Sequence, residues 1–219
     1  MSLPELDWQI IYGRVAWAIV LAALISALLP RAWRHSRVML AAIAVCAALL
    51  PMLPGEGSPT YWLGLVFQSP SALLVGLCLV KLHFAWQGES DNNTMPATLA
   101  ALIAVAGVAL YLDAIGLLSL GLFYSGFGPR GAPQLALLLA VLCSGAILRA
   151  RARAQSVAVL GALLLFAVLR LPTGNLWDAL LDPLLWGWAL FSLTAACRHS
   201  LTHSASDPCR NEDCMLPRA

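Results

Sequence analysis

Six polar residues of this otherwise apolar sequence could take part in chemistry. They are Arg14, Asp113, Arg170, Asn175, Asp178 and Asp182. A guanidinium group forms paired hydrogen bonds with phosphate or carboxylate, so Arg14 and Arg170 are candidates for binding an anionic head group. Asp113 or Asp178 is a candidate general base or proton carrier. The alternative is that these opposite charges pair between helices and bind no ligand.

Asp178 and Asp182 are four residues apart, in a stretch that also contains tryptophan and proline. On a helix this spacing places both carboxylates on one face, and Asn175 is a candidate cap for that helix. Two carboxylates on one face can hold a cation or shift each other's pKa. The alternative is that they form the solvated face of a turn at the membrane interface.

The C-terminal tail contains a separate pattern of possible metal ligands. His199 and His203 have the spacing that shares one helical face, and four residues separate Cys209 from Cys214. This cysteine spacing is near that of tetrahedral zinc sites, so the four residues are a candidate metal site. The alternative is a reduced, solvated tail. The sequence predicts no cofactor elsewhere.

The composition determines where such residues can act. Of the 219 residues, 60% are hydrophobic and only 11% are charged. Soluble domains contain roughly 45–50% apolar and about 25% charged residues, so this balance excludes a soluble globular protein. It also excludes a disordered chain and a nucleic-acid binder. The formal net charge of +2 points to no partner. The sequence therefore predicts a polytopic membrane protein whose first partner is the lipid bilayer.

The expected elements are helices, because backbone groups in lipid must pair within the chain and no run alternates as a barrel strand does. We predict an all-α membrane bundle of about seven transmembrane helices. Their approximate ranges are 8–29, 37–53, 70–86, 96–113, 133–149, 156–171 and 182–197. Residues 1–203 form a single domain, and 204–219 form a short disordered cytoplasmic tail.

The positive residues predict the orientation of this bundle. With the N-terminus outside and the C-terminus cytoplasmic, three positive residues lie outside, namely Arg14, Arg130 and Arg170. Ten lie inside, namely Arg31, Arg34, Arg37, Lys81, Arg149, Arg151, Arg153, Arg198, Arg210 and Arg218. This asymmetry is typical of the positive-inside rule. The excess of arginine over lysine, with many alanines and leucines, suggests a bacterial gene and hence the bacterial inner membrane.

Two apolar segments do not fit the seven ranges. Residues 60–69 precede Ser69 and Pro70, a plausible N-cap and first residue of the next helix, and would lie along the outer interface. Residues 114–127 are too short to cross the membrane and return. They form either a re-entrant or interfacial segment, or one long tilted helix followed by a glycine-rich loop.

The sequence contains no catalytic motif, so the leading hypothesis is a non-enzymatic accessory or assembly subunit of a cell-envelope complex. Small residues such as Ala22, Ala100 and Ala104 would allow close packing with other helices, in partner subunits or in a homo-oligomer. One alternative is a small membrane enzyme or carrier for a lipid-linked anionic substrate at the outer leaflet. A third is an ion or solute transporter that uses Asp113 as its intramembrane carboxylate.

Overall fold

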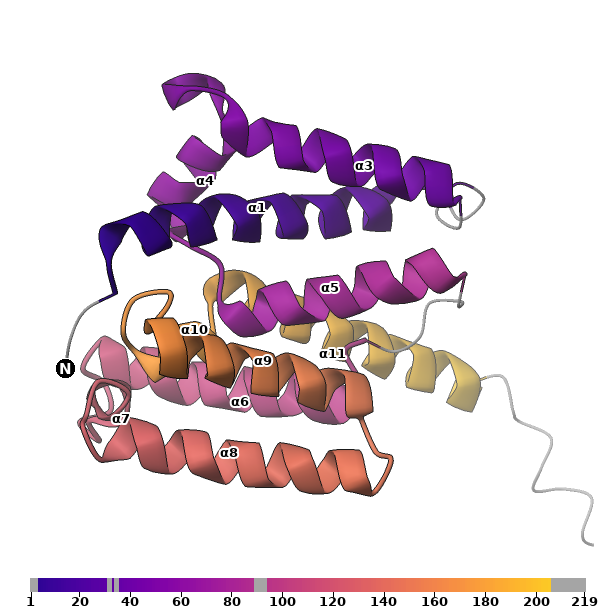
Figure 1. Cartoon of the computed structure of the whole chain (residues 1–219). Helices are drawn as coiled ribbons and strands as arrows, with labels where there is room; N and C mark the ends of the chain where they lie inside the picture. The colour runs from indigo at the N-terminus through magenta and orange to yellow at the C-terminus, as the bar shows by residue number, and fades with distance from the viewer. Residues whose placement is uncertain (1–3, 31–32, 34–35, 89–93, 206–219) are drawn as a thin grey trace, which may run out of the picture.

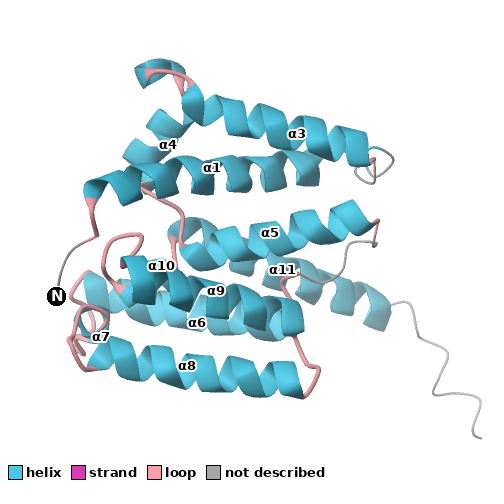
Figure 2. Ribbon diagram, in the orientation of Figure 1, coloured by secondary structure: helices cyan, strands magenta, loops and turns pink. Residues whose placement is uncertain are grey.

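The computed structural model describes residues 4–30, 33, 36–88 and 94–205, with side chains described as far as Arg198. Within these residues the chain is all-helical and contains no strand. Figure 2 shows that loops connect one helix directly to the next. The predicted all-α class is confirmed.

Long helices run back and forth along a common axis (Figure 1). In the described part of the chain they are α1 (Leu6–Leu28), α3 (Arg37–Leu49), α5 (Ala72–Gln87), α6 (Ala97–Ala114), α8 (Gly131–Leu148), α9 (Arg153–Leu169) and α11 (Pro183–Ala205). Each overlaps one of the seven predicted ranges. By length and composition, three of these described helices could cross a membrane, namely α1, α6 and α8.

The two ends of the bundle carry different features. At one end lie the short elements η1 (Leu50–Met52), η2 (Gly55–Gly57), α4 (Pro59–Phe67), α7 (Leu122–Ser125) and α10 (Leu176–Leu180), and we call this the capped end (Figure 1). At the other end, Arg37 begins α3, Arg149 and Arg151 lie between α8 and α9, and Arg153 begins α9. We call this the basic end. Arg130 and Arg170, which flank α8 and α9, lie at the capped end.

The core is centred on α5, which packs against α1 and α9. Its Leu77 is fully buried, as are Ala100 of α6 and Leu185 of α11. Close approach within the bundle depends on small residues. At Gly76 an added methyl group would stand 3.0 Å from the Cβ atom of Ala158 on α9, so α5 and α9 lie almost in backbone contact.

Helix α8 lies at the edge of the bundle and packs mainly on α9 (Figure 1). Of its residues only Ala132 is buried. Beyond Gln134 near its start, its exposed large side chains are aliphatic: Leu137, Leu138, Val141, Leu142 and Leu148. An apolar surface of this kind is the expected face of a helix in contact with lipid or with another membrane helix.

The segment 60–69 forms a helix of its own. Helix α4 ends at Phe67, and Gln68 turns the chain with a positive φ of 58°. The predicted cap at Ser69 is wrong, because Ser71 is the N-cap of α5 and accepts the backbone N–H of Leu74. Pro70 therefore lies before the helix and not within it.

Only the first residue of the segment 114–127 belongs to the long helix that precedes it. Helix α6 ends at Ala114, and Gly116 and Gly121 have positive φ values of 81° and 66°, which favour glycine. The preceding helix therefore does not extend through this segment, and the glycine-rich loop of the second alternative follows it directly. The segment instead forms a loop with the short helix α7 at the capped end (Figure 1).

Candidate functional site

Asp113 lies in the last turn of α6 and is buried, with 7% of its surface exposed. Its Oδ1 accepts the backbone N–H groups of Leu120 and Gly121, each at 2.9 Å. Its Oδ2 accepts the backbone N–H of Phe123 at 2.9 Å. Since the first N–H groups of a helix lack partners within the helix, one carboxylate here closes the loop and caps the start of α7.

Asn175 reaches the same loop from the opposite side. It is fully buried, its Nδ2 donates to the carbonyl of Phe123 at 3.3 Å, and its Oδ1 accepts the backbone N–H of Trp177 at 3.0 Å. It is thus the N-cap of α10, as the sequence suggests. Trp177 adds a bond from its indole N–H to the carbonyl of Leu122 at 2.8 Å.

Gly126 marks how tightly this loop packs on α10. Its carbonyl accepts the backbone N–H of Leu176 at 3.2 Å. A side-chain methyl group at this position would overlap Oδ1 of Asn175 and stand 2.6 Å from the Cδ1 atom of Trp177. The loop and α10 therefore form one packed unit in which Asp113 and Asn175 hold the backbone.

Asp178 bonds to a neighbouring side chain. The hydroxyl of Thr173 donates to its Oδ2 at 2.5 Å, and the same hydroxyl accepts the backbone N–H of Asn175. Partial burial raises the pKa of Asp178, and the bond from Thr173 opposes this rise. Burial is the larger effect, so the protein environment disfavours the charged form.

Asp182 joins two long helices at their starts. It is buried, its Oδ1 accepts the backbone N–H of Leu185 in α11 at 2.7 Å, and its Oδ2 accepts the backbone N–H of Ser71 before α5. The predicted pair of carboxylates on one helical face is wrong. Leu181 is extended and separates α10 from α11, so Asp178 and Asp182 belong to different elements.

The two candidate arginines lie apart from these acids. Arg170 ends α9 in a left-handed conformation and stacks over the ring of Phe166 at 5.0 Å. Arg14 is exposed on α1. Within the described residues neither forms an ion pair, so the interhelical pairing offered as the alternative is not seen for them.

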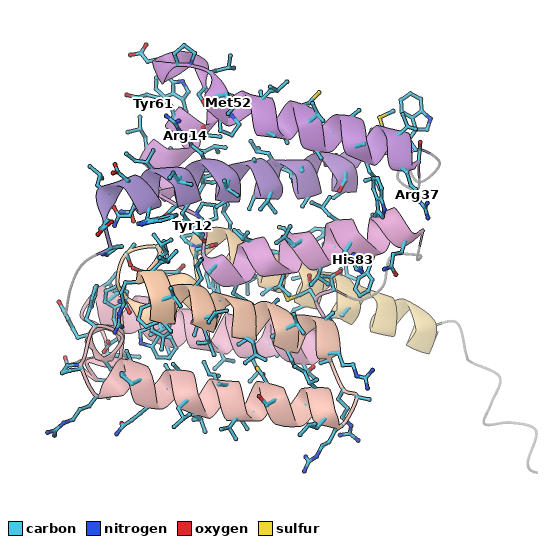
Figure 3. All side chains as sticks on the ribbon, viewed as in Figure 1. Tyr12, Arg14, Arg37, Met52, Tyr61 and His83 are labelled. Carbon is cyan, nitrogen blue, oxygen red and sulfur yellow. The ribbon has the colours of Figure 1, made fainter. Side chains whose placement is uncertain are left out.

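Arg14 instead borders a cavity of about 420 Å³. Helix α1 forms one wall, and η2 and α4 form the other, where Tyr61 lines the cavity opposite Arg14 (Figure 3). The rest of the lining is mixed. Its neutral polar side chains are Gln9, Ser58, Thr60, Gln68 and Ser69, and its apolar ones are Ile10, Trp17, Pro51 and Leu53. One guanidinium among hydrogen-bonding groups suits an anion, and no acidic residue lines this cavity in the described chain.

The six predicted residues therefore do not converge on one cavity. Asp113 and Asn175 bind the same short loop, and Asp178 is joined to Asn175 through the Thr173 hydroxyl. Asp182, Arg170 and Arg14 each occupy different surroundings. Gln68 and Tyr61 line the cavity, and Trp177 bonds to the loop. The sequence predicted none of these three contacts. The glycines around α7 could have indicated the role of Trp177. They predict a tight loop, and the backbone carbonyls of such a loop need hydrogen-bond donors from elsewhere in the chain.

The predicted metal ligands lie beyond what the structure describes. Cys209 and Cys214 fall outside the described residues, and the side chains of His199 and His203 are not described. Among the described residues, no group of three or more His, Cys, Asp or Glu side chains could hold a metal ion. The tail pattern stays a prediction.

Comparison with known proteins adds no relative. No family model, no curated protein and no solved structure matches this chain.

Proposed function

We propose that this protein is a seven-span protein of a bacterial inner membrane, with its N-terminus outside and its C-terminus in the cytoplasm. Three described helices have the length and composition of membrane spans. Arg37, Arg149, Arg151 and Arg153 lie at the basic end, whereas Arg130 and Arg170 lie at the capped end. Positive residues favour the cytoplasmic face, so the basic end is the cytoplasmic end.

Within that membrane we propose a non-enzymatic role, as an accessory or assembly subunit of a cell-envelope complex. One observation carries this proposal. Asp113, Asn175 and Asp182 use every side-chain oxygen to bond groups of their own chain, and Asp178 uses its Oδ2. A general base needs a free oxygen within reach of a substrate proton. These groups hold the α7 loop, the turn at Thr173 and the starts of α5 and α11 in place. Such a role suits a structural scaffold better than a catalytic site.

The exposed aliphatic face of α8 supports the same role. A helix that buries only Ala132 against its own chain has most of its surface free for lipid or for helices of other subunits. Membrane helices associate through close packing, and a methyl group added at Gly145 of α8 would meet no atom within 4 Å. A partner helix would have direct access to the α8 backbone there.

The size of the protein in its native membrane tests this proposal. A tagged chain, expressed at its natural level and extracted in mild detergent, should migrate on a native gel in a complex much larger than one chain. The same chain overproduced alone should migrate as one or two copies. A lone chain at natural level, together with catalytic turnover by the purified protein, would contradict the proposal.

A second candidate is a carrier or enzyme for a lipid-linked anionic substrate at the outer leaflet, favoured by the cavity beside Arg14. Farnesyl phosphate is a suitable probe, because it joins a phosphate to a short isoprenyl chain. It should raise the melting temperature of the wild-type protein and of Arg130→Gln, and farnesol should not. Arg14→Gln should lose the response. An equal response in Arg14→Gln would reject this cavity as the site.

The third candidate, an ion or solute transporter that uses Asp113, draws least support. A carrier carboxylate must exchange its ligand, and both oxygens of Asp113 hold backbone N–H groups of the α7 loop.

A further inference from the structure

An apolar groove of about 500 Å³ lies on the side of the bundle between α1 and α11, against α5. Trp17 and Leu63 border its outer part, and Leu24, Ala27 and Phe191 border the part nearer the basic end. It is separate from the cavity beside Arg14, although Trp17 contributes to the walls of both. Because it opens on the side of the bundle, a groove of this kind in a membrane protein faces lipid.

The length of the groove matches one leaflet. Its wall on α1 extends from Trp17 to Ala27. Ten residues of helix measure about 15 Å. The hydrocarbon core of a bilayer is about 30 Å thick, so one leaflet is also about 15 Å thick. The groove is therefore long enough for a lipid chain within one leaflet.

Lys81 is the one charged residue that lines this groove in the described chain. Its Nζ lies 5.5 Å from the ring centroid of Trp188, and it forms no ion pair within the described residues. An ammonium group in an apolar span is costly unless an anion or polar group accompanies it. Lys81 also lies in the half of α5 nearer the basic end, since α5 begins with Ala72 at the capped end and ends with Gln87.

We propose that this groove binds one acyl chain of an anionic phospholipid, with the lipid phosphate at Lys81. The lipid belongs to the leaflet at the basic end, and its chain extends along α1 toward Trp17. The negative charge of the phosphate complements the positive charge of Lys81, and the apolar walls of the groove complement the acyl chain. This inference goes beyond the proposed function and does not depend on it.

Native mass spectrometry of the whole chain, freed of lipid and titrated with phosphatidylglycerol or phosphatidylcholine, tests the proposal. The wild-type protein should prefer phosphatidylglycerol by about fivefold, which corresponds to one favourable basic residue near the membrane surface. Lys81→Gln should abolish this preference. Arg153→Gln, which removes a charge from the same end outside the groove, should keep it.

A second pair of variants tests whether the acyl chain of the lipid lies in the groove. Gly187 lines the groove, and a methyl group added there would meet no atom within 4 Å. Gly187→Leu should therefore fill the groove and weaken the binding of both lipids by about tenfold. Gly161→Leu, at an equally open and exposed site on α9, should bind as the wild type does. If Gly187→Leu fails to fold, Leu24→Trp on the opposite wall replaces it.

Two outcomes would overturn the proposal. Unchanged lipid binding in the groove-filling variants would place the lipid elsewhere, and a preserved preference in Lys81→Gln would place the phosphate elsewhere. If filling the groove leaves lipid binding intact but dissociates the native complex, the occupant is a helix of another protein.

Discussion

Asp113 and Asp182 are both buried, and both accept backbone N–H groups at the start of a helix. The sequence offered pairing with arginine as one alternative for these acids, whereas the structure provides backbone N–H groups as their partners. A short loop that folds back onto its own helix end brings N–H groups closer than any arginine, and residue types alone do not reveal such a loop.

Replacing Asp113 with asparagine tests its structural role. The amide keeps one acceptor oxygen but turns an NH₂ group toward one of the three N–H donors. We expect a lower melting temperature in detergent and a larger loss in Asp113→Ala. Asp7→Asn, at an exposed position in the first turn of α1, should melt as the wild type does. A stable Asp113→Asn protein that has lost its cellular role would instead indicate a chemical function.

The raised pKa of Asp178 gives a prediction for pH. The folded protein holds the proton more tightly than the unfolded chain does, so between the ordinary pKa and the raised value the free energy of unfolding falls as pH rises. Thermal melts from pH 4 to pH 7 should show this decrease in the wild type. Asp178→Asn should remove that part of the pH dependence and be at least as stable at pH 7. A steeper pH dependence in the variant would contradict the assignment.

At the scale of elements, apolar runs and breakers predicted where the long helices lie, and cap chemistry predicted Asn175 as the start of α10. The break between α4 and α5 was not predictable from the sequence. The hydroxyl of Tyr12 donates to the carbonyl of Pro70, and the indole of Trp17 donates to the carbonyl of Gln68. These contacts join residues more than fifty positions apart, which no local pattern encodes. They satisfy carbonyls exposed where α4 ends and α5 has not begun.

Packing of α6 against α11 depends on Gly107. A methyl group there would overlap the indole of Trp186, whose N–H bonds the carbonyl of Ala104. Gly107→Ala should therefore destabilise the protein by about 1–3 kcal/mol, the usual cost of overpacking a core. Gly161→Ala on α9, with open space around it, should be neutral or slightly stabilising. Chemical unfolding in detergent compares the two, and equal stabilities would show that α6 and α11 are not tightly packed.

At the scale of the whole molecule, the scarcity of charge predicted a helical membrane protein, and the structure agrees in class and in three apolar helices of sufficient length. The proposed orientation of these helices across the membrane is inferred from the ends of the bundle at which the arginines lie. The candidate site was less predictable, because similar depth in a membrane does not bring residues of different helices to one cavity. Arg14 faces α4, whereas Asp113 faces α7.

The accessibility of single cysteines in intact cells tests the proposed membrane arrangement most directly. In a chain whose own cysteines are replaced, Gly57→Cys and Arg130→Cys lie at the capped end, and Arg151→Cys lies at the basic end. A membrane-impermeant maleimide should label the first two in cells with a permeable outer membrane, and Arg151→Cys only after lysis. Labelling of Arg151→Cys from outside, or of all three from one side, would contradict the seven-span arrangement with its basic end in the cytoplasm.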